Sequence, residues 1–244
     1  MPPLVQLGPN ANRQLTLVKA TWKQGEHCLI TGGTGSGKTL LARYLDQMRI
    51  DAGGSVVVFI AKLQPDKTIT DYYSAKDGWV RWKKWRKPTM TDRKILLWPA
   101  VEGKTYKEAI TLMKEIFQEA LLEISRTGLW TVHIDEGLMM TDRESGLAFS
   151  SDIATMYALM RSAKGTMITL SQRPMHLPLS IYANLAWAFV GKAKELADVK
   201  RLANLDGSLD SRALAVMIRR NKLHEFVMIP IAQNREPEVI DLSK

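Results

Sequence analysis

Short apolar runs alternate with longer amphipathic stretches along most of the chain. The apolar runs predict buried strands at residues 28–30, 55–61, 95–98, 129–134, 166–170, 186–190 and 225–229. The amphipathic stretches predict helices at residues 40–45, 105–128, 151–163, 193–202 and 211–219. Strands that alternate with helices in this way predict an α/β fold, with a mostly parallel central sheet and helices on both faces.

The whole chain, residues 1–244, is expected to form a single domain with three less regular segments. In the N-terminal edge segment, residues 1–23, the alternation of residues 14–18 predicts a half-buried strand at the edge of the sheet. Residues 62–94 are irregular, basic and aromatic, and we expect them to form a small Trp-rich insertion. The polar residues 231–244 predict a C-terminal tail or an edge segment.

Composition and charge favour a basic protein of a reducing compartment. The 244 residues are 45% hydrophobic, which is enough for a full core, and no apolar run reaches membrane-spanning length. The single cysteine, Cys28, excludes an internal disulfide and predicts a small core residue in a cytoplasmic protein. The net charge of +9 favours a polyanionic partner, and DNA or RNA is the first candidate.

The stretch Gly-Gly-Thr-Gly-Ser-Gly-Lys-Thr at residues 32–39 carries the strongest chemical signal. It matches the phosphate-binding P-loop pattern, with a predicted strand before it and a predicted helix after it. Glycines let backbone N–H groups point at phosphate oxygens, and the helix N-terminus adds positive charge. Lys38 is expected to contact the β- and γ-phosphates, and the Thr39 hydroxyl to bind Mg²⁺. The predicted nucleotide-binding residues are Gly32, Gly33, Thr34, Gly35, Ser36, Gly37, Lys38, Thr39 and Leu40.

Two acidic residues, Asp135 and Glu136, directly follow the apolar run at residues 129–134. Downstream of a P-loop, this position predicts that Asp135 holds the Mg²⁺ shell. Glu136 is then the candidate general base that deprotonates the attacking water, and a second acid here favours hydrolysis over kinase chemistry. The alternative is a solvated turn at the end of a strand. His133, inside the apolar run, is expected to be packed rather than catalytic.

Gln172 and Arg173 follow the predicted strand at residues 166–170. In open α/β sheets, ligands bind at the carboxyl ends of the strands. The Gln172 amide both donates and accepts hydrogen bonds, so we expect it to contact the γ-phosphate and the attacking water. The alternative is that Gln172, Arg173 and Pro174 merely end the strand.

Taken in order, these motifs resemble the FtsK–HerA superfamily of DNA-pumping ATPases. The resemblance rests on residues 32–39, on Asp135 and Glu136, and on Ser-Gln-Arg-Pro at residues 171–174, and it covers roughly residues 24–229. It implies a RecA-type (ASCE) P-loop NTPase fold, ATP and Mg²⁺ as cofactors, and a homo-oligomeric ring, usually a hexamer, that moves DNA. The chain looks like a minimal member from a phage or mobile element, which implies the host cytoplasm or the virion as further locations.

The resemblance also implies an arginine finger, which reaches the ATP of the neighbouring subunit from the segment before Gln172. Arg161 matches that position, and a planar, permanently charged guanidinium can neutralise charge on a transferring phosphoryl group. Arg143 and Arg173 are the reserve candidates. The alternative is a solvated Arg161 near a helix C-terminus, where cations are favoured.

Residues 78–87 combine three tryptophans with five cations. Their spacing of three predicts that Trp79, Trp82 and Trp85 share one side of a helical turn. One hypothesis is that they stack on bases of DNA. The other is that they pack the insertion onto the motor or at a subunit interface, with the cations free to contact phosphates in either case.

The sequence therefore predicts an ATPase that couples hydrolysis to DNA translocation, for packaging or transfer. The predicted catalytic residues are Lys38, Glu136, Gln172 and Arg161, and the predicted magnesium ligands are Thr39 and Asp135. One alternative is an ATP-dependent switch that recruits partners to DNA. The other is a small-molecule kinase, against which Glu136 and Gln172 argue.

Overall fold

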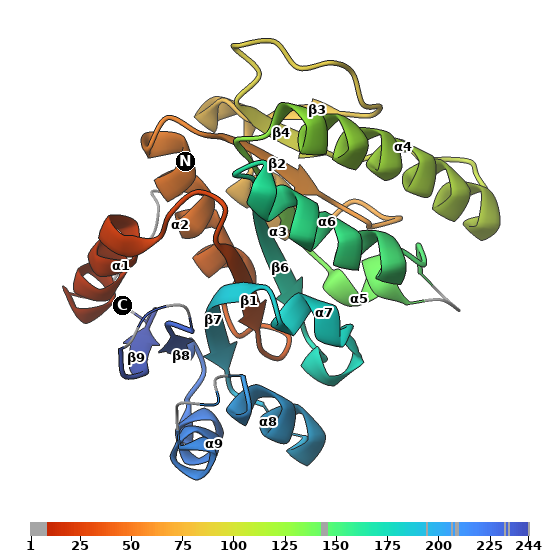
Figure 1. Ribbon diagram of the computed structural model, residues 1–244. Coiled ribbons are helices and arrows are strands. Elements are labelled where there is room, and N and C mark those ends of the chain that lie inside the picture. The colour runs from red at the N-terminus through yellow and green to blue at the C-terminus, as the bar shows by residue number, and fades with distance from the viewer. Residues whose placement is uncertain are drawn as a thin grey trace.

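The computed structural model describes residues 9–142, 146–193, 195–205, 207, 210–231, 233 and 235–243. In these residues one nine-stranded sheet runs in the order β3-β4-β2-β5-β6-β1-β7-β8-β9 (Figure 1). The strands are β1 (His27–Thr31), β2 (Ser55–Phe59), β3 (Val80–Trp82), β4 (Lys94–Leu97), β5 (Trp130–Ile134), β6 (Thr166–Ser171), β7 (Leu185–Gly191), β8 (Glu225–Ile229) and β9 (Glu238–Asp241). Pairing is parallel from β3 through to β7, and β8 and β9 are added antiparallel. The predicted α/β fold with a mostly parallel sheet is confirmed.

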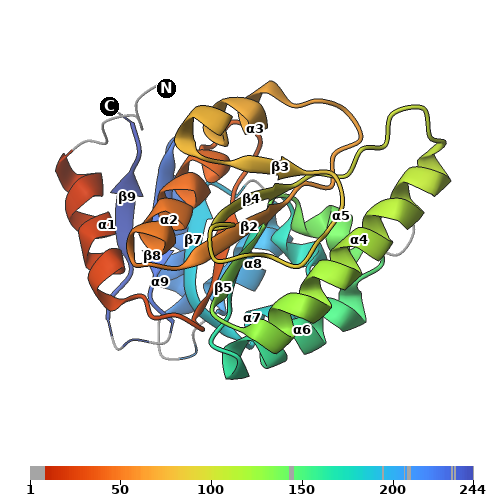
Figure 2. The ribbon, with the colours of Figure 1, turned by 90° about the horizontal axis from the view of Figure 1, so that it is seen from above.

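Helices cover both faces of the sheet, and Figure 2 shows the two layers from above. One layer contains α1 (Pro9–Thr21), α2 (Lys38–Asp51) and α3 (Lys67–Tyr72). The other contains α4 (Tyr106–Thr127), α5 (Gly137–Thr141), α6 (Ser150–Ser162), α7 (Leu179–Tyr182), α8 (Leu196–Ala203) and α9 (Ser211–Arg220). The short 3₁₀ turns are η1 (Ala75–Asp77) and η2 (Pro174–His176).

The strands are apolar on both sides because each side faces a helical layer. In β2, Val57 and Phe59 join the core under α4, whereas Val56 and Val58 join the core on the opposite face. Phe59 stacks on Phe117 of α4 with a ring-centroid distance of 4.7 Å. Continuous apolar runs are typical of parallel strands that are buried on both faces, as here.

The N-terminal prediction is wrong, because residues 14–18 lie in the helix α1 rather than in a strand. The buried side chains there are Ala11, Leu15, Val18 and Trp22, whose spacings of four, three and four define one helical face. The apparent alternation was too short to outweigh this longer period. α1 nevertheless lies at the sheet edge, where the Gln14 side chain donates to the backbone oxygen of Val239 in β9 at 2.9 Å.

Residues 62–94 add the edge strand β3 to the sheet, and the predicted helical turn of tryptophans is wrong. Trp82 ends the edge strand β3, which Trp79 precedes. Because successive residues of an extended chain point to opposite faces, a spacing of three separates these two side chains. Trp79 joins the core beside α3, whereas Trp82 and Trp85 join the core of the other face. All three are buried, which supports packing over base stacking.

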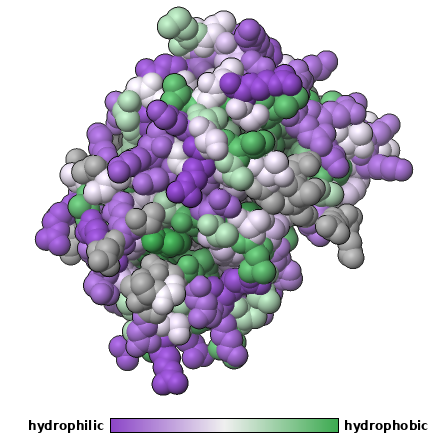
Figure 3. All heavy atoms as spheres, viewed as in Figure 1, coloured by the Kyte–Doolittle hydropathy of each residue, from purple (hydrophilic) through white to green (hydrophobic). Residues whose placement is uncertain are grey.

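The C-terminal residues 238–241 form the edge strand β9, so the edge-segment alternative holds there. Hydrophilic side chains cover most of the face seen in Figure 3, and hydrophobic residues lie between them in small groups. None of the helices in the described part of the chain is long and apolar enough to cross a membrane.

Candidate nucleotide-binding site

The P-loop joins β1 to α2 at the carboxyl edge of the sheet. The Gly32 N–H donates to the Ser171 oxygen at the end of β6, with a distance of 3.3 Å. Gly37 precedes α2 with φ 96°, a backbone conformation that strains any other residue. A Cβ atom there would also lie 3.2 Å from His224 Nδ1. Gly37 has no side chain to cap α2, so no N-cap side chain occupies the first N–H groups of the helix, and a helix N-terminus of this kind suits phosphate binding.

Lys38 turns its ammonium back into this loop. Lys38 Nζ donates to the backbone oxygens of Gly32 at 2.7 Å and Gly33 at 2.9 Å. Burial lowers the pKa of Lys38, while the charges of Glu136 and Asp135 act in the opposite direction. The positive charge therefore lies between the loop and the two acids, where the β- and γ-phosphates are expected.

Glu136 and Gln172 lie together because β5 and β6 are adjacent parallel strands, so their carboxyl ends meet at one edge. Gln172 Nε2 donates to Glu136 Oε2 at 3.3 Å. On its other side, Gln172 Oε1 accepts from the Thr34 hydroxyl at 3.0 Å. Gln172 thus joins the candidate general base to the P-loop.

Burial, followed by the neighbouring Asp135 charge, raises the pKa of Glu136. Hydrogen bonds from the Leu138 backbone and from Gln172, together with the Lys38 charge, act against this rise. A carboxylate with a raised pKa is a better proton acceptor near neutral pH than an ordinary glutamate. The electrostatics of Glu136 therefore suit a general base.

Asp135 is the more buried of the two acids, with only 4% of its side chain exposed. Its Oδ2 atom lies 3.1 Å from Lys62 Nζ, and Thr39 lines the same cavity. The residues fit Mg²⁺ because a carboxylate and a hydroxyl oxygen are suitable ligands and the Lys62 ammonium already marks a place where a cation is stable.

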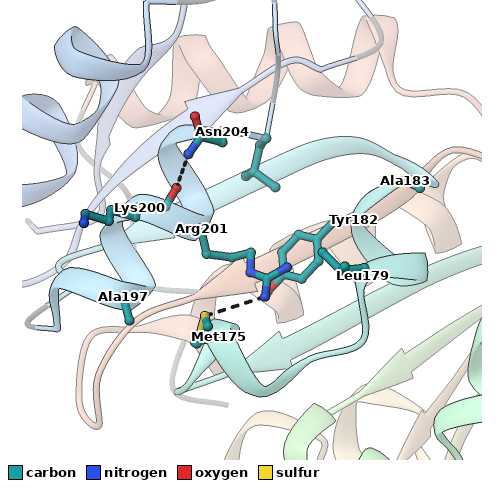
Figure 4. A pocket seen from close by; sticks show the side chains of 9 residues that line it. Met175, Leu179, Tyr182, Ala183, Ala197, Lys200, Arg201 and Asn204 are labelled. Atoms are coloured by element: carbon teal, nitrogen blue, oxygen red, sulfur yellow. Dashed lines mark hydrogen bonds between the residues drawn. The ribbon is translucent and has the colours of Figure 1, made fainter.

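One cavity of about 450 Å³ is lined by Thr34, Lys38, Thr39, Asp135, Glu136 and Gln172, together with Lys62, Asp66, Tyr72 and His224. A second cavity of about 720 Å³ lies between η2, α7 and α8. Its walls come from Met175, Leu179, Tyr182 and the side chains of α8 (Figure 4). There the Arg201 guanidinium lies 5.5 Å from the centre of the Tyr182 ring and donates to Met175 Sδ (Figure 4). Of these two cavities, the first combines the P-loop with acidic side chains, so it is the candidate nucleotide site.

Arg161 does not lie in its own chain's cavity. It is exposed in the last turn of α6. Burial lowers the pKa of His27 to about 4, and the positive charge of Arg161 contributes to this lowering. His27 begins β1, whereas the P-loop follows the end of β1, and five residues of strand separate the two edges by roughly 13 Å. An Arg161 finger would therefore act on a neighbouring subunit.

The reserve arginines are placed differently. Arg173 forms ion pairs with Glu195 at 3.5 Å and with Asp198 at 3.6 Å, so it ties η2 to α8. Arg143 lies outside the described residues.

His133 and Cys28 are buried, as expected. His133 Nδ1 lies 2.9 Å from Asp46 Oδ2 and 3.1 Å from the Tyr73 hydroxyl. This buried cluster connects β5 to the P-loop helix α2 and to the segment after α3. Its role is structural, because none of the three side chains lines the nucleotide cavity.

Sequence reasoning missed Lys62, Asp66 and His224, all of which line the cavity. Lys62 had a usable signal, because it follows the apolar run at residues 55–61 and so lies at the carboxyl end of a strand. His224 had none, since the antiparallel strand β8 brings it to the P-loop from a distant part of the sequence.

No protein-family model matches the sequence, and the comparison with curated proteins finds no match. Among solved structures, the chain is similar to B204, the DNA-packaging ATPase of Sulfolobus Turreted Icosahedral Virus, with TM-score 0.61 and 15% identity over 89% of this chain and 97% of that one. It is also similar to the genome packaging NTPase B204 of Sulfolobus turreted icosahedral virus 2 in complex with ATP-gammaS, with TM-score 0.57 and 11% identity over 88% and 97%. VirB4 of Thermoanaerobacter pseudethanolicus gives TM-score 0.65 and 12% identity over 89% of both chains. The P-loop ATPase fold predicted from the FtsK–HerA resemblance is confirmed.

Proposed function

We propose that the chain is an ATP-hydrolysing motor that moves DNA, for packaging or transfer, and works as a homo-oligomeric ring in the cytoplasm or in a virion. The single observation that carries this proposal is the Thr34–Gln172–Glu136 chain of hydrogen bonds beside Lys38. These hydrogen bonds join the predicted phosphate-binding loop to the candidate general base within one cavity. The similarity to packaging NTPases supports the substrate class.

In this mechanism, Lys38 binds the β- and γ-phosphates, and Thr39 and Asp135 would hold Mg²⁺. The bound ion would neutralise phosphate charge during phosphoryl transfer. Glu136 takes a proton from the attacking water, which Gln172 orients against the γ-phosphate. Gln172 also contacts the P-loop, so loss of the γ-phosphate would change the hydrogen bonds of Gln172. This change would be transmitted to β6 and η2, which flank Gln172 in the chain.

The position of Arg161 supports the proposed ring. Since this side chain lies at the edge of the sheet opposite its own P-loop, a head-to-tail arrangement would bring it to the ATP of the next subunit. Closure of such an arrangement gives a ring, and a hexamer is the size that we propose. The basic loop at residues 83–93, beside β3 (Figure 1), is the surface that we propose for DNA.

Mixing two inactive variants tests this proposal. Lys38→Ala keeps Arg161, and Arg161→Ala keeps the P-loop, so a mixed ring would contain some complete sites. We expect ATPase activity to return in part on mixing, at a native mass that is a multiple of the subunit mass. Inactivity of the mixture despite co-assembly, or normal hydrolysis by Arg161→Ala alone, would contradict action between subunits.

The two alternative functions give different results in simple assays. A switch would hydrolyse ATP without displacing a third strand from a DNA triplex, whereas a translocase displaces it. A kinase would need an acceptor, so ATP turnover without any phosphate acceptor argues for hydrolysis.

A further inference from the structure

Lys62 lies between two carboxylates in the wall of the candidate nucleotide cavity. It follows β2 closely in the chain, and its Nζ atom is 3.1 Å from Asp135 Oδ2 and 2.6 Å from Asp66 Oδ2. Asp135 is the candidate magnesium ligand, whereas Asp66 is the N-cap residue of α3. One ammonium therefore connects the metal position to a neighbouring helix.

Asp135 needs this counter-charge. Only 4% of its side chain is exposed, compared with 34% for Lys62. A buried carboxylate without a partner is strongly destabilising, because it loses water without gaining a compensating charge. Lys62 supplies that charge in the arrangement described here, at the place where Mg²⁺ is expected.

Asp66 and the Lys62 backbone are both fixed, so the movable part is the Lys62 side chain. Asp66 Oδ1 caps α3 by accepting from the N–H groups of Thr68 at 2.9 Å and Ile69 at 3.3 Å, which leaves Oδ2 for Lys62. The Lys62 backbone oxygen accepts from Trp98 Nε1 at 3.0 Å. The flexible lysine stem can therefore leave Asp135 and stay paired with Asp66.

We propose that Lys62 is a built-in counter-ion of Asp135 that must leave for Mg²⁺ to bind, and that Asp66 retains it when it leaves. An ammonium and a Mg²⁺ ion on the same carboxylate repel each other, so the two cations compete for Asp135. The inference rests on the proposed function, because it takes the cavity to be the Mg²⁺–nucleotide site. It makes Lys62 a positioning residue that sets how much Mg²⁺ the site needs.

Binding of ADP, measured by isothermal titration calorimetry in EDTA and over a series of Mg²⁺ concentrations, tests this competition. In Lys62→Met, Asp135 has no lysine counter-charge when Mg²⁺ is absent, and Mg²⁺ meets no competing ammonium when it is present. The factor by which Mg²⁺ tightens ADP binding should therefore rise about tenfold, and the Mg²⁺ midpoint should fall. Lys67→Met, which removes an exposed lysine from the first turn of α3, is the matched control and should match the wild type.

Asp66→Asn gives a shift in the opposite direction. Its Oδ1 can still cap α3, but the neutral amide no longer holds Lys62, so the ammonium stays with Asp135. The Mg²⁺ midpoint should rise about threefold. If Lys62 and Asp66 had only structural roles, the two variants would not shift the Mg²⁺ midpoint in opposite directions. If Lys62→Met fails to fold, the shift of the midpoint in Asp66→Asn tests the competition by itself.

The outcomes separate this inference from the proposed function. If wild-type ADP binding depends on Mg²⁺ but neither variant shifts the midpoint, or both shift it in the same direction, the competition is refuted and the nucleotide site stands. If the wild type binds no ADP, or Lys38→Ala binds it unchanged, both are refuted.

Discussion

Gln172 donates a hydrogen bond from its side-chain nitrogen to the Glu136 carboxylate across 3.3 Å, and so joins the end of β6 to the end of β5. Its oxygen accepts from Thr34 at the same time. An amide is suited to this bridge because it donates and accepts with a single side chain. In the proposed mechanism, a change at the γ-phosphate would therefore act through Gln172 on the candidate general base and on the segment after β6.

Glu136→Gln should bind ATP and Mg²⁺ but hydrolyse ATP about 10²–10⁴ times more slowly, because positioning survives and proton acceptance is lost. Single-turnover hydrolysis and ATP affinity measured together check this. Glu119→Gln, an exposed glutamate on α4, is the control and should be fully active. Full activity of Glu136→Gln would place the base elsewhere.

Hydrolysis should show an acid limb above the ordinary glutamate pKa of about 4.3. Burial and the Asp135 charge raise the pKa of Glu136, and only the ionised form accepts a proton, so the rate falls as pH drops through that raised pKa. Gln172→Ala removes a hydrogen bond that lowers this pKa, so the limb should move to higher pH. A pH–rate profile whose limb stays in place or moves to lower pH in Gln172→Ala would argue against Glu136 as the titrating base.

Trp82→Ala should destabilise the protein, since Trp82 is 5% exposed and packs against Trp85 with ring centroids 5.4 Å apart. Loss of a buried tryptophan costs about 3–5 kcal/mol. At about 2–4 °C per kcal/mol for a chain of this size, the Tm should fall by roughly 6–20 °C. Met90→Ala, at an exposed position of the same segment, should leave the Tm unchanged. A stable Trp82→Ala protein with lost DNA binding would restore the stacking hypothesis.

The five cations of residues 78–87 are all exposed, namely Arg81, Lys83, Lys84, Arg86 and Lys87. If they contact phosphates, replacing them with serine should weaken DNA binding and reduce the salt slope of log K by about 0.9 for each lost contact. Replacement of Lys104, Lys107 and Arg126, which lie at the two ends of α4, is the matched control. Unchanged affinity and slope would exclude the segment from the DNA path.

The sheet and the P-loop could be predicted because their signals are local. Apolar runs such as residues 55–61 need no knowledge of the rest of the chain, and the capping box of Thr105 and Glu108 at the start of α4 is present as the sequence indicates. The P-loop, the Asp135–Glu136 pair and Gln172 each follow a parallel strand, and these strands are neighbours in the sheet. The three motifs therefore lie together, because the carboxyl ends of neighbouring parallel strands meet at one edge.

Other features depend on contacts that the sequence does not encode locally. Leu15 and Leu17 looked like one face of a strand, but burial against α2 and β8 selects the helical face of α1. The tryptophans looked like a helical stripe, yet pairing of β3 with β4 extends the chain and divides them between two faces. The ion pair of Lys62 with Asp135 joins residues 73 positions apart, so it emerges only from the fold.

The steady-state ATPase rate of the wild type and of Lys38→Ala, measured with and without duplex DNA, tests the central claim most directly. The Lys38 ammonium lies in the P-loop, where it donates to the backbone oxygens of Gly32 and Gly33. Loss of this ammonium should remove the charge that neutralises the phosphates in the transition state. The account predicts hydrolysis by the wild type that DNA stimulates, and no measurable hydrolysis by Lys38→Ala under either condition. Equal rates in the two proteins, or a wild-type rate that DNA does not change, would contradict it.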